Sequence, residues 1–189
     1  WLHGPGPRFS LYSLLGVNYL ISRGDISWPG FQAVARGGDL VVYANENAFP
    51  LGIVQYEQLG RERFNNLPFQ AKDAVLMRAV VTQTPVEGLP ELDPSGLDIG
   101  ASAALETDYV SPARRHQREG LKIEQFSNKR VTGTIQAARD GVLVFSVPDS
   151  PGWSLYVDGV ETPLFRANLG MIAAKIAAGS HRIEIVHQR

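Results

Sequence analysis

The chain has 189 residues, of which 44% are hydrophobic and 20% charged, a balance typical of a globular protein that can bury its own core. It contains no cysteine, which excludes disulfides and cysteine-ligated metal sites, and its formal net charge of −1 provides no broad basic surface for nucleic acid. No apolar run approaches the roughly 18–20 residues needed to cross a bilayer, and the N-terminus lacks the pattern of a signal peptide. Both ends look cut, so we expect a fragment of a longer protein.

The first 82 residues predict a small mixed α/β or β subregion. Residues 9–16 predict a short helix, because three leucines fall on one helical face and a glycine follows them. Clusters of β-branched and aromatic residues between turn residues predict strands at 18–21, 39–43 and 52–56. Residues 74–82 are ambiguous between helix and strand, and their Val80-Val81-Thr82 end favours a strand.

Residues 83–118 predict a linker or long loop, because prolines and glycines recur among small residues in its first part. A basic cluster, residues 114–118, predicts a solvated loop, since acidic residues follow closely. From residue 119 to residue 189, short strands alternate with turns at the density of a β-sandwich. The seven predicted strands lie at 121–126, 130–136, 142–147, 153–157, 160–165, 171–177 and 181–187. The predicted fold class is therefore mainly β, with a seven-strand β-sandwich in the C-terminal half.

The strongest local signal in the chain is the dipeptide Asp158-Gly159 between two apolar strands. A two-residue type I′ turn needs positive φ at both central positions, and Asp-Gly tolerates that well. The sequence therefore predicts a tight hairpin centred on this pair.

The order of several short motifs resembles the C-terminal extracytoplasmic region of the YfhO family of bacterial multi-spanning membrane proteins. In the second half these are a strand, a Gly-Trp followed by an Asp-Gly hairpin, an asparagine before a long strand, and a final Ala-Gly-x-His-x-Ile strand, at residues 141–146, 151–159, 168–171 and 178–183. Residues 15–21 and 42–51 resemble the family more loosely, with altered spacing around Asn45, and residues 84–118 match no motif of it.

This resemblance implies a parent with many membrane helices, similar to GT-C-type glycosyltransferases that act on cell-envelope polymers. It implies that the fragment lies on the extracytoplasmic face of a bacterial membrane, tethered by helices outside this sequence. The catalytic carboxylates of such enzymes lie on loops beside the membrane helices, so the resemblance places them outside this fragment.

Five residues are the candidates for ligand binding, and each has a competing structural role. Trp153 and Tyr156 could stack on a glycan, but residues three apart on a strand point to opposite faces, so we expect Trp153 in the core and Tyr156 exposed. Asp158 suits a turn for backbone reasons, and Asn168 suits a cap. Asn45 belongs to the looser N-terminal motif.

No residues in the sequence form a recognisable catalytic or metal-ligating set, and no cofactor is expected. The four histidines, His3, His116, His181 and His187, lack ligand spacing, and no serine lies in a nucleophile motif.

The predicted function is a non-catalytic accessory domain of an envelope glycosyltransferase, which recognises acceptor or glycan or supports the membrane domain of its own parent chain. A free-standing carbohydrate-binding or adhesion module is the alternative, and a hydrolytic enzyme is a third possibility without positive support. Nucleic acid is not an expected partner.

Overall fold

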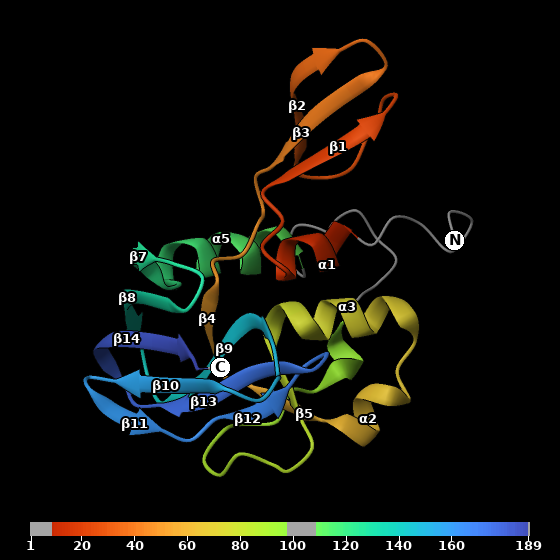
Figure 1. Cartoon of the computed structure of the whole chain (residues 1–189). Coiled ribbons are helices and arrows are strands. Elements are labelled where there is room, and N and C mark those ends of the chain that lie inside the picture. Colours follow the sequence, from red (N-terminus) through yellow and green to blue (C-terminus); the bar gives the residue numbers. More distant parts are fainter. Residues whose placement is uncertain (1–8, 98–108, 189) are drawn as a thin grey trace.

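The computed structural model describes residues 9–97 and 109–188, which form three β-sheets and a small group of helices (Figure 1). A six-stranded sheet and a five-stranded sheet build the body of the molecule, and a three-stranded sheet projects from it. The prediction of a mainly β chain is therefore confirmed.

The six-stranded sheet joins the two halves of the sequence. Its order is β4-β9-β13-β12-β6-β5, with bounds β4 (Gly52–Gln55), β5 (Gln58–Gly60), β6 (Val80–Thr82), β9 (Gly141–Pro148), β12 (Phe165–Ala167) and β13 (Met171–Ile176). β4 pairs antiparallel with β9, and β5 pairs parallel with β6. The chain between β5 and β6 forms the helices α2 (Arg61–Asn65) and α3 (Phe69–Arg78). Half of this sheet thus comes from the N-terminal part of the chain.

The five-stranded sheet is antiparallel throughout and lies entirely in the C-terminal part. Its order is β11-β10-β14-β8-β7, with bounds β7 (Lys122–Phe126), β8 (Arg130–Ala137), β10 (Trp153–Val157), β11 (Val160–Thr162) and β14 (Gly179–His187). The body is a curled half-barrel rather than the predicted seven-strand sandwich of residues 119–189. Periodicity locates single strands, but it does not say which distant strands pair, so it missed the strands recruited from residues 52–82.

Strand β9 explains how the body is layered, because its successive side chains enter two different cores. Leu143 and Phe145 enter the core between the two larger sheets, together with Leu155 and Ile183 of the five-stranded sheet. Val142 and Val144 point the other way, into a second core. A strand buried on both faces is continuously apolar, as this one is.

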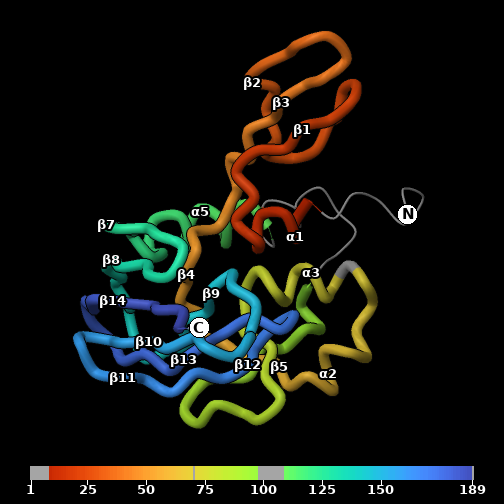
Figure 2. Tube along the Cα trace, in the orientation of Figure 1, coloured from red at the N-terminus to blue at the C-terminus, as the bar shows by residue number. Residues whose placement is uncertain are grey.

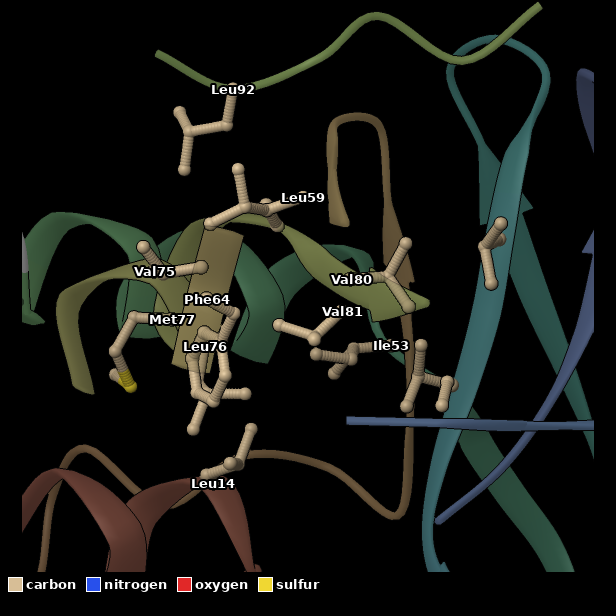
Figure 3. Close-up of a cluster of buried hydrophobic side chains, with 14 of the residues drawn as sticks. Leu14, Ile53, Leu59, Phe64, Val75, Leu76, Met77, Val80, Val81 and Leu92 are labelled. Atoms are coloured by element: carbon tan, nitrogen blue, oxygen red, sulfur yellow. The ribbon is translucent and has the colours of Figure 1, made fainter. Parts of the chain in front are cut away.

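The second core lies between the six-stranded sheet and the helices. Figure 3 shows Val75, Leu76 and Met77 of α3 meeting Val80 and Val81 of β6, with Leu14 of α1 (Phe9–Leu14) below them. Further apolar side chains of this core come from the segment after β6, which includes the short helix η1 (Pro94–Gly96).

The strand predicted over residues 74–82 is wrong for most of its length. α3 continues to Arg78, Ala79 adopts an extended conformation, and only Val80–Thr82 form a strand. Val75, Leu76 and Met77 are all buried, so the helix shows no apolar and polar alternation that would separate it from a buried strand.

The basic cluster at residues 114–118 is helical, not a solvated loop. α5 (Ser111–Glu119), which lies within the segment predicted as a linker, packs near β4 and α3. Its His116 is buried against Phe49, with the ring centroids 4.7 Å apart, and Nε2 of the imidazole lies 3.2 Å from the carbonyl oxygen of Met77. Because arginines surround His116 in the sequence, the pattern gave no sign that this one position of the cluster is buried.

The three-stranded sheet has the order β1-β3-β2, with bounds β1 (Tyr19–Arg23), β2 (Phe31–Gly37) and β3 (Leu40–Asn45). The sequence did not predict β2. One face of the sheet covers its own small core of Phe31, Val41 and Tyr43, against which Tyr12 and Trp28 pack. Figure 2 shows the chain entering and leaving this sheet through two adjacent segments, where the Asn45 N–H donates to the Asn18 carbonyl at 2.8 Å.

Candidate functional site

A hollow beside Trp153 is the most suitable ligand site in the C-terminal sheets. It has a volume of about 370 Å³ and is lined by Trp153, Ser154, Glu161, Thr162, Pro163 and Leu164. The first four come from the paired strands β10 and β11, and the last two from the segment that leads toward β12. Trp153 and Thr162 occupy inner-face positions of this hairpin, and Ser154 and Glu161 occupy outer-face positions. The hollow therefore lies at the edge of the sheet, where an aromatic ring, hydroxyl groups and a carboxylate line it from both faces.

Trp153 is positioned by contacts on two sides. It is half-buried and packs against the core between the larger sheets, and its ring lies 4.6 Å from that of His187 on the neighbouring strand β14. The expectation that this tryptophan has a core role is met in part, since the same side chain also lines the hollow.

Glu161 and Ser154 supply polar groups at the rim. Glu161 is exposed and forms no ion pair with any residue in the ranges that the structure describes. Ser154 is half-buried, and the Thr162 hydroxyl donates to the carbonyl of Val160 at 3.1 Å, which leaves its lone pairs available as acceptors.

Tyr156 does not join Trp153 in the hollow. Residues of β10 alternate around the fully buried Leu155, so Tyr156 lies on the outer face, opposite Glu184 of β14 and Glu161 of β11. It is half-buried there rather than exposed. The prediction that these two aromatic side chains point to opposite faces is confirmed.

Asp158 serves the turn and is fully engaged by neighbouring residues. Its φ of 53° and the φ of 82° at Gly159 give the predicted type I′ hairpin, with Val157 paired to Val160. The carboxylate lies 2.7 Å from Nδ1 of His181 and accepts the Arg182 N–H at 2.8 Å. These hydrogen bonds, the one with His181 first, lower the pKa of Asp158, and the hydrogen bond with Asp158 raises the pKa of His181.

This contact links two of the motifs on which the family resemblance depends. The Asp-Gly hairpin and the final Gly-x-His strand are joined by Asp158 and His181, whose Nε2 also lies 3.0 Å from the carbonyl oxygen of Ala177. The two motifs are thus held together by hydrogen bonds between the turn at residues 158–159 and the first part of β14.

Asn168 is completely buried and ties the C-terminal strands to β6. Its Oδ1 accepts the N–H of Val81, its own N–H donates to the Val81 carbonyl, and its carbonyl accepts from Nη2 of Arg61 at 3.0 Å. Its φ of 49° belongs to the left-handed region, which asparagine tolerates better than most residues.

Asn45 is also buried and structural, at the foot of the three-stranded sheet. Its Nδ2 donates to the carbonyl of Val17 at 2.9 Å, and its Oδ1 accepts the N–H of Asn47. Of the five candidate residues, Trp153 alone lines the hollow.

Glu161, Ser154 and Thr162 were not among the candidates; the hairpin register was predictable from the sequence, but it places Ser154 and Glu161 on the face opposite to Trp153. A two-residue turn at 158–159 fixes the register, so the predicted hairpin already placed Glu161 opposite Tyr156 and Thr162 opposite Leu155. Pro163 and Leu164, which form the remaining wall, lie in an irregular segment between β11 and β12. The sequence pattern did not predict the conformation of that segment.

The histidines are not brought together. His181 lies beside Asp158, His187 lies beside Trp153, and His116 of α5 lies beside Phe49. His3 is outside the described residues. In the described part of the chain, no three His, Asp or Glu side chains are grouped as metal ligands. No helix among those residues is both long and apolar enough to cross a bilayer.

Comparison with known proteins gives one family. The model of the bacterial membrane protein YfhO matches residues 103–188, which confirms the predicted resemblance over the motifs at residues 141–183. The match also includes residues 103–118, which were expected to match no motif of the family, whereas residues 15–21 and 42–51 lie outside it. No curated protein and no solved structure matches the chain.

Proposed function

Because the model of the bacterial membrane protein family YfhO matches residues 103–188, we propose that the chain is an extracytoplasmic, non-catalytic domain that binds cell-envelope glycan for a membrane glycosyltransferase parent. The observation that carries this proposal is the hollow beside Trp153, which lies wholly within the matched residues. The membrane domain of the same parent chain is the structural partner in this proposal.

The lining of the hollow suits a carbohydrate. An indole ring offers an apolar surface to the C–H face of a sugar ring, and carboxylate and hydroxyl groups bind sugar hydroxyls directionally. Trp153 would provide the stacking surface, and Glu161 would accept hydrogen bonds. Ser154 and Thr162 would complete the polar rim.

The same lining supports a binding role rather than glycosidic cleavage. Hydrolysis of a glycosidic bond ordinarily needs two carboxyl groups, about 5–10 Å apart across the scissile bond. The hollow contains a single carboxylate, that of Glu161, and Asp158 nearby is engaged by His181 and Arg182.

The proposal is tested by NMR titration of the labelled chain with glucose disaccharides, N-acetylglucosamine oligomers and delipidated lipoteichoic acid. We expect chemical-shift changes confined to the backbone of residues 153–154 and 161–164 and to the Trp153 indole N–H. Glu161→Gln should weaken binding about tenfold, the effect of losing roughly one charged hydrogen bond. Glu62→Gln, at an exposed carboxylate on α2, is the matched control and should bind normally.

A purely structural role is the second candidate, and a specific observation favours it. The side-chain oxygens of Asp158, Asn168 and Asn45 all accept hydrogen bonds from other residues of the chain. If no envelope glycan shifts the resonances around the hollow, glycan binding is excluded and structural support of the membrane domain becomes the better proposal.

A further inference from the structure

The three-stranded sheet has an apolar face that its own core does not explain. Its outer face, defined here as Tyr19, Ile21, Leu40, Val42 and Ala44, is opposite to the face that buries Val41 and Tyr43. Tyr19 is 67% exposed, Ile21 65% and Leu40 42%. Val34, the residue inserted by the bulge in β2, is 56% exposed as well.

This arrangement differs from an ordinary solvated sheet. An antiparallel sheet with one buried face usually carries polar side chains on the other, so that strands alternate between apolar and polar residues. Here β1 and β3 are apolar on both sides over most of their length. Arg23 is the one charged residue on the outer positions of β1 and β3, and it lies 3.6 Å from Asp39 at the tip.

The face is also free of the other sheets and helices among the residues that the structure describes. Figures 1 and 2 show the three-stranded sheet standing away from the two larger sheets, to which the segments before β1 and after β3 connect it. A broad, planar partner can therefore approach the outer face without meeting the body.

We propose that the outer face of the three-stranded sheet docks on the surface of a lipid bilayer, with its aliphatic side chains in the boundary between headgroups and acyl chains. Amphipathic elements bind membranes in this way, and tyrosine is enriched at this depth because its ring is apolar and its hydroxyl polar. The match of residues 103–188 to a family of bacterial membrane proteins supports a bilayer within the protein's surroundings. The proposal goes beyond glycan binding and holds whether or not the hollow binds a glycan.

The exposed area argues against a second copy of the chain as the occupant. Tyr19, Ile21 and Leu40 together present on the order of 350 Å² at their observed exposures, judging from the size of large apolar side chains. A stable protein–protein interface needs about 800 Å² from each partner, of which roughly 450–500 Å² is apolar. The apolar area of the outer face is smaller than that.

Vesicle co-sedimentation tests the proposal directly. The chain is incubated with phosphatidylcholine vesicles and with vesicles containing one-third phosphatidylglycerol. We expect binding to both, changed less than threefold by 0.5 M NaCl, because the basic side chains Arg23 and Arg36 already lie beside Asp39 and Asp25. Ile21→Asp should weaken vesicle binding at least tenfold.

Val160→Asp is the matched control, since Val160 is 69% exposed but lies on β11 of the body. It should bind vesicles as the unchanged chain does. Circular dichroism verifies that both variants are folded, and Ile21→Trp provides a second readout through a blue shift of its fluorescence on vesicles.

Three results would overturn the proposal. One is failure of the unchanged chain to bind either vesicle, and another is equal binding by Ile21→Asp. The third is a dimer in light scattering that Ile21→Asp converts to a monomer, which would assign the outer face to a second copy.

Discussion

His116 is a buried titratable residue whose surroundings disfavour the protonated form of its imidazole. Burial, together with the positive charge of Arg115, lowers its pKa from 6.5 to about 3. Between these two pH values the unfolded chain binds a proton at this imidazole that the folded chain does not bind. The free energy of unfolding therefore falls as pH decreases through this window.

We predict that His116 lowers the free energy of unfolding by about 2 kcal/mol between pH 7.5 and pH 5, since each pH unit within the window costs up to about 1.4 kcal/mol. The raised pKa of His181 acts in the opposite direction, so the effect is measured as the difference between the unchanged chain and a His116 variant. His116→Gln should remove most of this slope, because an amide can still donate to the Met77 carbonyl but does not titrate. Urea unfolding at pH 5, 6 and 7.5 measures the effect. An unchanged slope in His116→Gln would contradict the assignment.

The β10–β11 hairpin is the element that the sequence predicted best. Its turn depends only on two adjacent residues, so the signal is local and the strand pairing follows from it. The helix α3 shows the opposite case. Its inner face and the strand that follows it are equally apolar, and the boundary at Ala79 depends on tertiary packing rather than on a breaker residue.

We predict that Gly159→Ala destabilises the chain by about 1–2 kcal/mol, the cost of holding an ordinary residue in the left-handed region. An added Cβ meets no other atom there, so the cost is conformational and not steric. Gly60→Ala is the control, because that position is equally open and its φ is −63°. Thermal unfolding of the two variants should differ by several degrees, and equal melting temperatures would show that the turn relaxes.

At the scale of the whole molecule, the sequence predicted most strands but not how the two halves combine. Residues 52–82 contribute three strands and α3, and they cover Val142, Val144 and Ala173 on the face of the six-stranded sheet that points away from the five-stranded sheet. Pairing between β4 and β9 joins residues that are 87 to 93 positions apart in the sequence, which no local pattern encodes. The hollow beside Trp153 was missed for a related reason, since one of its walls is irregular chain.

We therefore predict that residues 120–189 do not fold cooperatively alone. Removal of β4, β5, β6 and the helices would leave one face of β9 and β13 in water. The fragment should show a broad, non-sigmoidal urea transition and poor dispersion in its NMR spectrum, whereas the full chain should unfold sharply. A sharp transition in the fragment would mean that the C-terminal strands form an independent domain.

The two segments that lead into and out of the three-stranded sheet lie side by side, and this has a consequence for how the protein can vary in sequence. Because Asn45 bonds to Asn18 where the chain returns, the 26 residues between them begin and end at almost one point. The body fixes the position of that point, but it sets little limit on the length or structure of the segment between the two residues. An insertion of this kind can be lengthened, shortened or exchanged while the sheets beneath keep their register, so it is the natural place for related proteins to diverge in what they contact.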